Sequence, residues 1–106
     1  MDKGIMDELI FKCSIALSKL VGCTFTFKEE DWDTIRQLHR EYYCSKAISS
    51  VEIEVSPMRH ITFIFQDGSQ KHIFNMEQLE AFHGQVGEFG SIYEYAVEHD
   101  VSNLFD

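Results

Sequence analysis

The sequence predicts a single α+β domain over residues 1–106, with helices packed on a four-stranded, mostly antiparallel sheet. Two observations predict this class. Apolar residues recur at helical spacing in some segments and alternate with polar residues in others, and turn residues separate these segments. A hydrophobic fraction of 44% and a charged fraction of 25% are ordinary for a folded chain of one domain. The expected order of elements is α-β-α-β-β-β-α-α.

Two helices and one strand are expected in the first 44 residues. Residues 5–21 carry a helical apolar stripe that ends at Gly22, where a left-handed C-cap is favoured. Residues 23–27 alternate with period two, which predicts a short strand. Residues 28–44 are predicted to be helical, because acidic residues at their start suit the helix dipole. Five of their side chains keep helical spacing: Trp32, Ile35, Leu38, His39 and Tyr42.

An antiparallel meander is expected between residues 51 and 74. Its strands cover residues 51–55, 59–66 and 70–74, joined by a three-residue turn and by a two-residue turn at Asp67 and Gly68. These turn lengths predict four cross-strand pairs: Ile53 with Ile61, Val51 with Phe63, Ile61 with Phe74, and Phe63 with His72.

The expected register has consequences for the second face of the sheet. Ile64 and Ile73 share that face, which makes it half apolar. We therefore expect either a helix or a partner to cover it. His60 and His72 are placed on opposite faces, so they are not expected to act together.

Two capped helices are expected at the end of the chain. Asn75 is the N-cap of a helix over residues 76–83, and Gln78 completes a capping box. Ser91 caps a second helix, with Glu94 at its third position. A loop with three glycines joins the two helices.

The charge of the chain is strongly asymmetric. Eighteen acidic and nine basic residues give a formal net charge of −9. The first 71 residues contain all nine basic residues and eleven acidic ones, whereas the segment after Lys71 contains seven acidic residues and no Lys or Arg. Direct binding to nucleic acid or to an anionic membrane is therefore disfavoured, and a protein with a basic surface is the expected partner. The alternative is a solvated acidic surface that favours solubility.

The acidic segment also contains an aromatic residue on a glycine loop. Phe89 lies between Gly87 and Gly90, and an aromatic side chain ringed by polar residues is a common centre of protein interfaces. The alternative is that Phe89 folds back into the core. The candidate partner-binding residues are Glu77, Glu80, Glu88, Phe89, Tyr93, Glu94 and Glu98.

No catalytic, metal-binding or cofactor-binding residues are predicted. The five histidines and three cysteines show no Cys-x-x-Cys, His-x-x-x-His or His-Glu-x-x-His spacing. Cys13 and Cys23 fall on apolar stripes, and Cys44 is the one cysteine expected to be exposed. Three sparse cysteines and the lack of a long apolar run favour a reduced protein of the cytoplasm without a membrane span.

The last third of the chain resembles the end of small phage-encoded inhibitors of bacterial defence, the type I-F anti-CRISPR proteins among them. The resemblance rests on Phe74, on Glu77 to Glu80, on the glycine loop at 84–90 and on the amphipathic helix at 92–98. It implies a non-enzymatic protein that occupies a nucleic-acid-binding surface of a bacterial effector complex.

The sequence therefore predicts a small acidic binding protein, not an enzyme, that occludes a basic surface of a protein partner. Three alternatives remain open at this point. The first is a homodimeric regulatory or structural module that associates through the sheet face bearing Ile64 and Ile73. The others are an immunity or antitoxin-type protein and, least favoured, a small enzyme.

Overall fold

The computed structural model describes residues 3–105 and is an α+β fold built on one antiparallel sheet. The sheet has five strands in the order β4-β3-β2-β1-β5, one more than the sequence predicts. No helix among the described residues is long and apolar enough to cross a membrane. The elements are α1 (Lys3–Ser18), β1 (Thr24–Asp33), β2 (Leu38–Glu54), β3 (His60–Phe65), β4 (Gln70–Ile73), α2 (Met76–Ala81), β5 (Gln85–Val86), the 3₁₀ turn η1 (Gly87–Phe89), α3 (Ile92–Glu98) and the 3₁₀ turn η2 (Val101–Leu104).

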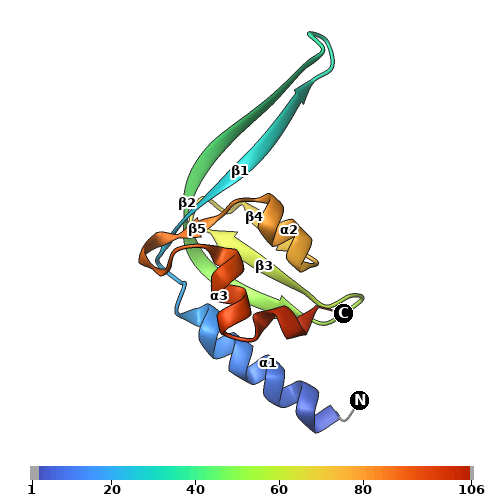
Figure 1. Ribbon diagram of the computed structural model, residues 1–106, viewed down its shortest axis with the longest axis vertical. Coiled ribbons are helices and arrows are strands. Elements are labelled where there is room, and N and C mark those ends of the chain that lie inside the picture. Colours follow the sequence, from blue (N-terminus) through green and yellow to red (C-terminus); the bar gives the residue numbers. More distant parts are fainter. Residues whose placement is uncertain (1–2, 106) are drawn as a thin grey trace.

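The predicted helix over residues 28–44 is wrong, because this segment forms a long β-ribbon. β1 and β2 pair without interruption from Thr24 opposite Ala47 to Asp33 opposite Leu38. Asp33 begins the turn, since its Oδ1 atom accepts hydrogen bonds from the amides of the residues two and three positions later, at 3.0 and 3.1 Å. Gln37 closes the turn in the left-handed region at φ 56°. Figure 1 shows the ribbon rising out of the body, with α1 at the opposite end of the molecule.

The core lies between one face of the sheet and the helices. Four phenylalanines from β1 and β3 form its centre with ring centroids 4.9–6.2 Å apart: Phe25, Phe27, Phe63 and Phe65. Buried side chains from α1, α2 and α3 complete the same cluster, among them Leu17, Leu79 and Ile92. Gly84 touches this centre directly, since a Cβ atom there would lie 2.8 Å from the Phe25 ring.

One of the two expected registers in the meander is confirmed and the other is shifted by one residue. β2 and β3 pair Ile53 with Ile61, as the turn length predicts. β3 and β4 pair Ile61 with Ile73 instead of with Phe74. The reason is a three-residue loop, not a two-residue one: the Phe65 amide donates to the Ser69 carbonyl at 2.9 Å, and Gly68 adopts φ 87° inside the loop.

A one-residue shift moves every β4 side chain to the other face of the sheet. Ile73 is consequently buried in the core, while Ile64 lies on the opposite face, so the two do not form the shared apolar face that was expected for a homodimer. His72 pairs with Thr62 and lies on the same face as His60, which corrects the expectation that the two histidines lie apart.

The capped helices at the end of the chain are confirmed. Asn75 accepts a hydrogen bond from the Gln78 amide at 2.8 Å, and the Gln78 side chain accepts one from the Phe74 amide. Ser91 accepts from the Glu94 amide at 3.3 Å. α2 is shorter than predicted, because the chain turns at Phe82 to run into the short strand β5 beside β1.

Candidate functional site

The most distinctive surface of the protein is the distal half of the β1–β2 ribbon, residues 30–41, which we call the arm. All of its residues except the half-buried Asp33 are exposed. The arm makes the molecule 52 Å long, against 28 and 24 Å in the other two directions (Figure 1). An isolated two-stranded ribbon contributes little stability by itself, so the arm is not explained by the needs of the core.

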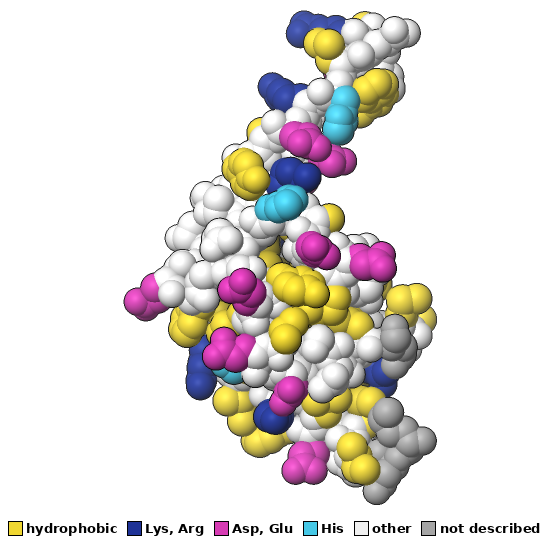
Figure 2. All heavy atoms as spheres, viewed as in Figure 1, with side chains coloured by type: hydrophobic (Ala, Val, Ile, Leu, Met, Phe, Trp, Pro, Cys, Tyr) yellow, Lys and Arg dark blue, Asp and Glu magenta, His cyan; other side chains and the backbone are white. Residues whose placement is uncertain are grey.

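Large apolar side chains are exposed at the end of the arm. Ile35 is 94% exposed in the turn, and Trp32 and Leu38 are each 57% exposed on the two strands. Trp32 is paired with His39 and Leu38 with Asp33, so their side chains lie on opposite faces of the ribbon. The tip thus has apolar groups on both faces and at its end, which Figure 2 shows standing clear of the body.

Polar side chains of the two strands contact each other below this tip. On one face His39 Nε2 lies 3.7 Å from Glu30, and on the other Arg40 lies 3.2 Å from Asp31. Arg40 also lies over the ring of Tyr42, 5.4 Å from its centroid. Pairs of this kind each contribute about 0.2–1 kcal/mol to an antiparallel ladder, so they maintain the register without needing a core.

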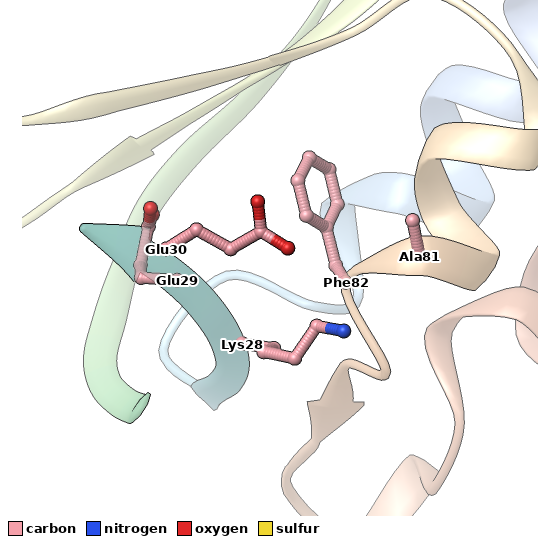
Figure 3. A pocket seen from close by; sticks show the side chains of 5 residues that line it. All are labelled: Lys28, Glu29, Glu30, Ala81 and Phe82. Atoms are coloured by element: carbon pink, nitrogen blue, oxygen red, sulfur yellow. The ribbon is translucent and has the colours of Figure 1, made fainter. Parts of the chain in front are cut away.

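The base of the arm is fixed to the body by Lys71 of β4. Its ammonium group forms an ion pair with Glu29 and lies over the rings of Phe27 and Phe82 at 5.0 and 4.7 Å from their centroids. The Lys28 amide donates to the Phe82 carbonyl at 2.7 Å. Figure 3 shows the small pocket that these contacts leave between β1 and the end of α2. The direction in which the arm leaves the body is therefore set by β4 and α2.

The seven residues predicted to bind a partner are all exposed, but they do not form one patch. Glu80, Tyr93 and Glu94 line a common groove between α2 and α3, together with His83 and Gln85. The others lie outside this groove, namely Glu77 in the first turn of α2, Glu88 in η1, Phe89 beside α3, and Glu98 next to α1.

Phe89 is partly packed and partly exposed. Its ring meets the buried ring of Tyr95 edge to face, with centroids 5.4 Å apart and an interplanar angle of 77°. It is nevertheless 43% exposed. Tyr93 lies two residues before Tyr95 on the same helix and is exposed, so Phe89 and Tyr93 are presented on different sides of α3.

The acidic side chains of the last third are mostly unpaired. Among residues 72–105, none of the five glutamates forms an ion pair: Glu77, Glu80, Glu88, Glu94 and Glu98. Asp100 differs, because its carboxylate lies 2.8 Å from Lys12 Nζ. This hydrogen bond, reinforced by the opposite charge, lowers the pKa of Asp100 and raises the pKa of Lys12. Figure 2 shows carboxylates spread over the body on the side of α2 and α3.

The thiols of Cys13 and Cys44 are not activated as nucleophiles. Cys13 is fully buried and Cys44 is half-buried, and burial raises the pKa of both thiols. A raised pKa leaves less thiolate at neutral pH, so neither has the environment of a reactive cysteine. The expectation of an exposed Cys44 is therefore met only in part.

Two groups of histidine and glutamate side chains have the proximity needed for metal ligands. One consists of Glu54, His60 and His72 on the second face of the sheet, and the other of Glu30, His39 and Glu41 on the arm. In each group the ligand atoms lie within 4.8 Å of one another. The arm group is fully exposed, whereas His60 is only 7% exposed.

The arm could have been found from local signals in the sequence. The side chain of Asp33 can accept hydrogen bonds from amides further along the chain, as in many turns, and Trp and Tyr favour strands on both sides of it.

No protein-family model matches the chain, and neither a curated protein nor a solved structure shows significant similarity to it.

Proposed function

We propose that the protein is a non-enzymatic, acidic binding protein of the cytoplasm that covers a basic surface of a protein partner with its body and contacts that partner through the arm. The observation that carries this proposal is the arm itself. An inhibitor of a bacterial defence complex, acting on a surface that would otherwise bind nucleic acid, is the instance that the sequence resemblance implies.

The arm supports a binding role because its tip has no structural partner. Trp32, Ile35 and Leu38 expose apolar surface that the fold does not bury, although the same chain builds a well-packed core from four phenylalanines and other apolar residues. Exposed apolar groups on a projecting element are characteristic of interaction sites, and aromatic anchors contribute much of the binding energy at interfaces.

The charge of the body supports the choice of partner. A net charge of −9 repels nucleic acid and anionic membranes over a range of about 10 Å at moderate ionic strength. The groove of Glu80, Tyr93 and Glu94 combines two unpaired carboxylates with an aromatic ring. Such a groove complements Lys and Arg side chains, which pair with carboxylates and stack on aromatic rings.

The experiment compares four baits in affinity purification from a bacterial lysate at low and high salt. The baits are the parent chain, an arm variant (Trp32→Ala, Ile35→Ser, Leu38→Ser), a groove variant (Glu80→Lys, Glu94→Lys) and a control (Phe11→Ser, Ile15→Ser). The control removes apolar surface from α1, where Phe11 and Ile15 are 68% and 48% exposed at the opposite end of the molecule.

We expect the parent chain and the control to retain one specific protein. Its retention should weaken as the salt concentration rises, and it should be lost with the arm and groove variants. Equal retention by all four baits would contradict it. Recovery of only a second copy of the chain would contradict it as well.

A further inference from the structure

We propose that Glu54, His60 and His72 form a binding site for a divalent transition-metal ion, with zinc as the best-fitting metal. The site lies on the face of the sheet opposite the core and is separate from the arm and from the acidic groove. It is independent of the proposed binding function.

Three neighbouring strands bring the ligands together. Glu54 at the end of β2 is paired with His60 at the start of β3, and His72 of β4 is paired with Thr62, two residues further along β3. Residues two apart on a strand share a face, so all three side chains project on the same side. One ligand atom from each lies within 4.8 Å of the other two.

Hydrogen bonds orient both rings in the way that metal-binding histidines are commonly oriented. His60 Nδ1 lies 2.8 Å from the Met58 carbonyl oxygen, which can only accept, so Nδ1 donates and Nε2 faces Glu54. Thr62 is buried, with 1% exposure, and its hydroxyl lies 2.9 Å from His72 Nδ1. The ring of Phe74 stacks on His60 at a centroid distance of 4.5 Å and fixes its plane.

His60 and Glu54 are in direct contact at the proposed site. His60 Nε2 lies 2.6 Å from a Glu54 carboxylate oxygen. Since the other ring nitrogen already donates to a carbonyl, two acceptors face one ring whose side chain is only 8% exposed. The ring of His72 lies beside this pair, so two imidazoles and one carboxylate converge on one point, as a shared metal ion requires.

The ligand set selects the class of metal. Two imidazoles and one carboxylate suit zinc and its neighbours in the first transition row, whereas calcium and magnesium prefer oxygen ligands alone. Tetrahedral zinc holds nitrogen and oxygen ligands about 2.0–2.2 Å away, so the ligand atoms would sit about 3.3 Å from one another. The contact of 2.6 Å between His60 and Glu54 would have to lengthen to that separation, and any longer separation, up to 4.8 Å, would have to shorten. His72 is exposed and Glu54 is 43% exposed, so the fourth position faces solvent.

The arm group provides a matched control. Glu30, His39 and Glu41 also contain a histidine between carboxylates, but this group has one imidazole and every member is exposed. His39 Nε2 lies 3.7 Å from Glu30, and its ring tilts against Trp32 with no buried hydroxyl or carbonyl to orient it. The expected order of zinc affinity therefore places Glu54, His60 and His72 first.

The test is isothermal titration of the metal-stripped full chain with zinc, together with the visible absorption spectrum after addition of cobalt(II). We expect one zinc per chain, a higher melting temperature with zinc, and a cobalt spectrum typical of tetrahedral coordination. His72→Gln and Glu54→Gln should each weaken zinc binding at least about tenfold, since even partners of metal ligands have effects of that size. His39→Gln should leave the affinity unchanged.

NMR of the parent chain keeps the proposal testable if a variant misfolds. Zinc should shift the ring resonances of His60 and His72 and leave those of His39 in place. Absence of zinc binding to the folded parent chain would overturn the proposal. So would unchanged affinity in a folded His72→Gln variant, or loss of binding in His39→Gln.

Discussion

Tyr95 joins the two helical parts of the core through a single hydrogen bond. Its hydroxyl donates to the Ala16 carbonyl at 2.5 Å, and this carbonyl belongs to the last turn of α1, where carbonyls lack partners within the helix. The bond is buried and bridges α3 to α1. It therefore satisfies an acceptor that would otherwise be shielded from water.

Tyr95→Phe should lower the free energy of unfolding by about 1–2 kcal/mol, because it leaves a buried carbonyl without a donor while keeping the ring. Urea denaturation followed by circular dichroism measures this change. Tyr93→Phe is the control, since Tyr93 is exposed on the same helix and should have almost no effect. Equal losses in both variants would show that the hydroxyl of Tyr95 does not have this role.

Asp67 stabilises the loop between β3 and β4 through its charge. Hydrogen bonds from the hydroxyl and then the amide of Ser69, assisted by Lys46, lower the pKa of Asp67 from 3.8 to about 2. A pKa that is lower in the folded state means that this contribution to stability is complete above about pH 3.8 and is lost as the pH falls through about 2.

Ser69→Ala removes the hydroxyl and should raise the pKa of Asp67 toward its ordinary value. Carbon-13 NMR of the Asp67 carboxyl group measures the midpoint in both proteins. The stability difference between parent and variant should be constant at neutral pH and should shrink below about pH 3.8. A midpoint that does not move in Ser69→Ala would contradict the assigned cause.

At the scale of elements, periodicity predicts the parts of the fold that are buried and fails where nothing is buried. The stripe over residues 5–21 and the alternation over 51–55 both identify core-facing elements, because burial imposes those periods. Trp32, Ile35 and Leu38 recur at helical spacing, yet none of them faces a core. Their spacing therefore carries no information about the backbone, and the Asp33 turn together with the strand preference of aromatic residues decides the conformation.

The shifted strand shows how much depends on one loop residue. The sequence Asp67 and Gly68 fits a two-residue turn, but Gly68 instead ends a three-residue loop in a positive-φ conformation. This choice buries Ile73 and brings His72 beside His60. Sequence spacing could not reveal the three-residue metal group, since its members come from three strands and meet only in the observed register.

The arm should be dispensable for folding. Replacing residues 30–41 with the turn sequence Asn-Gly removes no core side chain and should change the free energy of unfolding by less than about 1 kcal/mol, since a free ribbon is marginal by itself. Amide NMR spectra of the shortened and full chains should agree for the body. An unfolded shortened chain would show that the arm is a structural element, and its binding role would lose its support.

At the scale of the whole molecule, the surface has two parts that would interact with a partner through different forces. The body carries most of the negative charge, which acts over several ångströms and depends on salt. The arm carries exposed apolar groups, which act only on contact and depend little on salt. Together they suit a partner with a basic surface and an adjoining apolar cleft. The charge of the body would attract this partner, and the apolar groups of the arm would then bind in its cleft.

The two parts also differ in how far the sequence reveals them. The acidic segment is visible as a run without Lys or Arg, and three of its residues do meet in one groove. Its remaining candidates are scattered, because charge composition says nothing about which side of a helix a residue occupies. The amino-acid composition does not predict the arm, because its length and direction follow from strand pairing and from the contacts of Lys71 at its base.

Trp32 allows the central claim to be tested directly, because it is the single tryptophan of the chain and lies on the arm. Biosynthetic labelling with 5-fluorotryptophan gives one fluorine resonance that reports on the arm alone, whatever tryptophans the partner contains. In the free protein this resonance should show the solvent isotope shift of an exposed ring. On addition of the partner isolated with the parent chain it should move and lose that shift. A complex that forms while the Trp32 resonance stays unchanged would contradict the claim that the arm is the binding element.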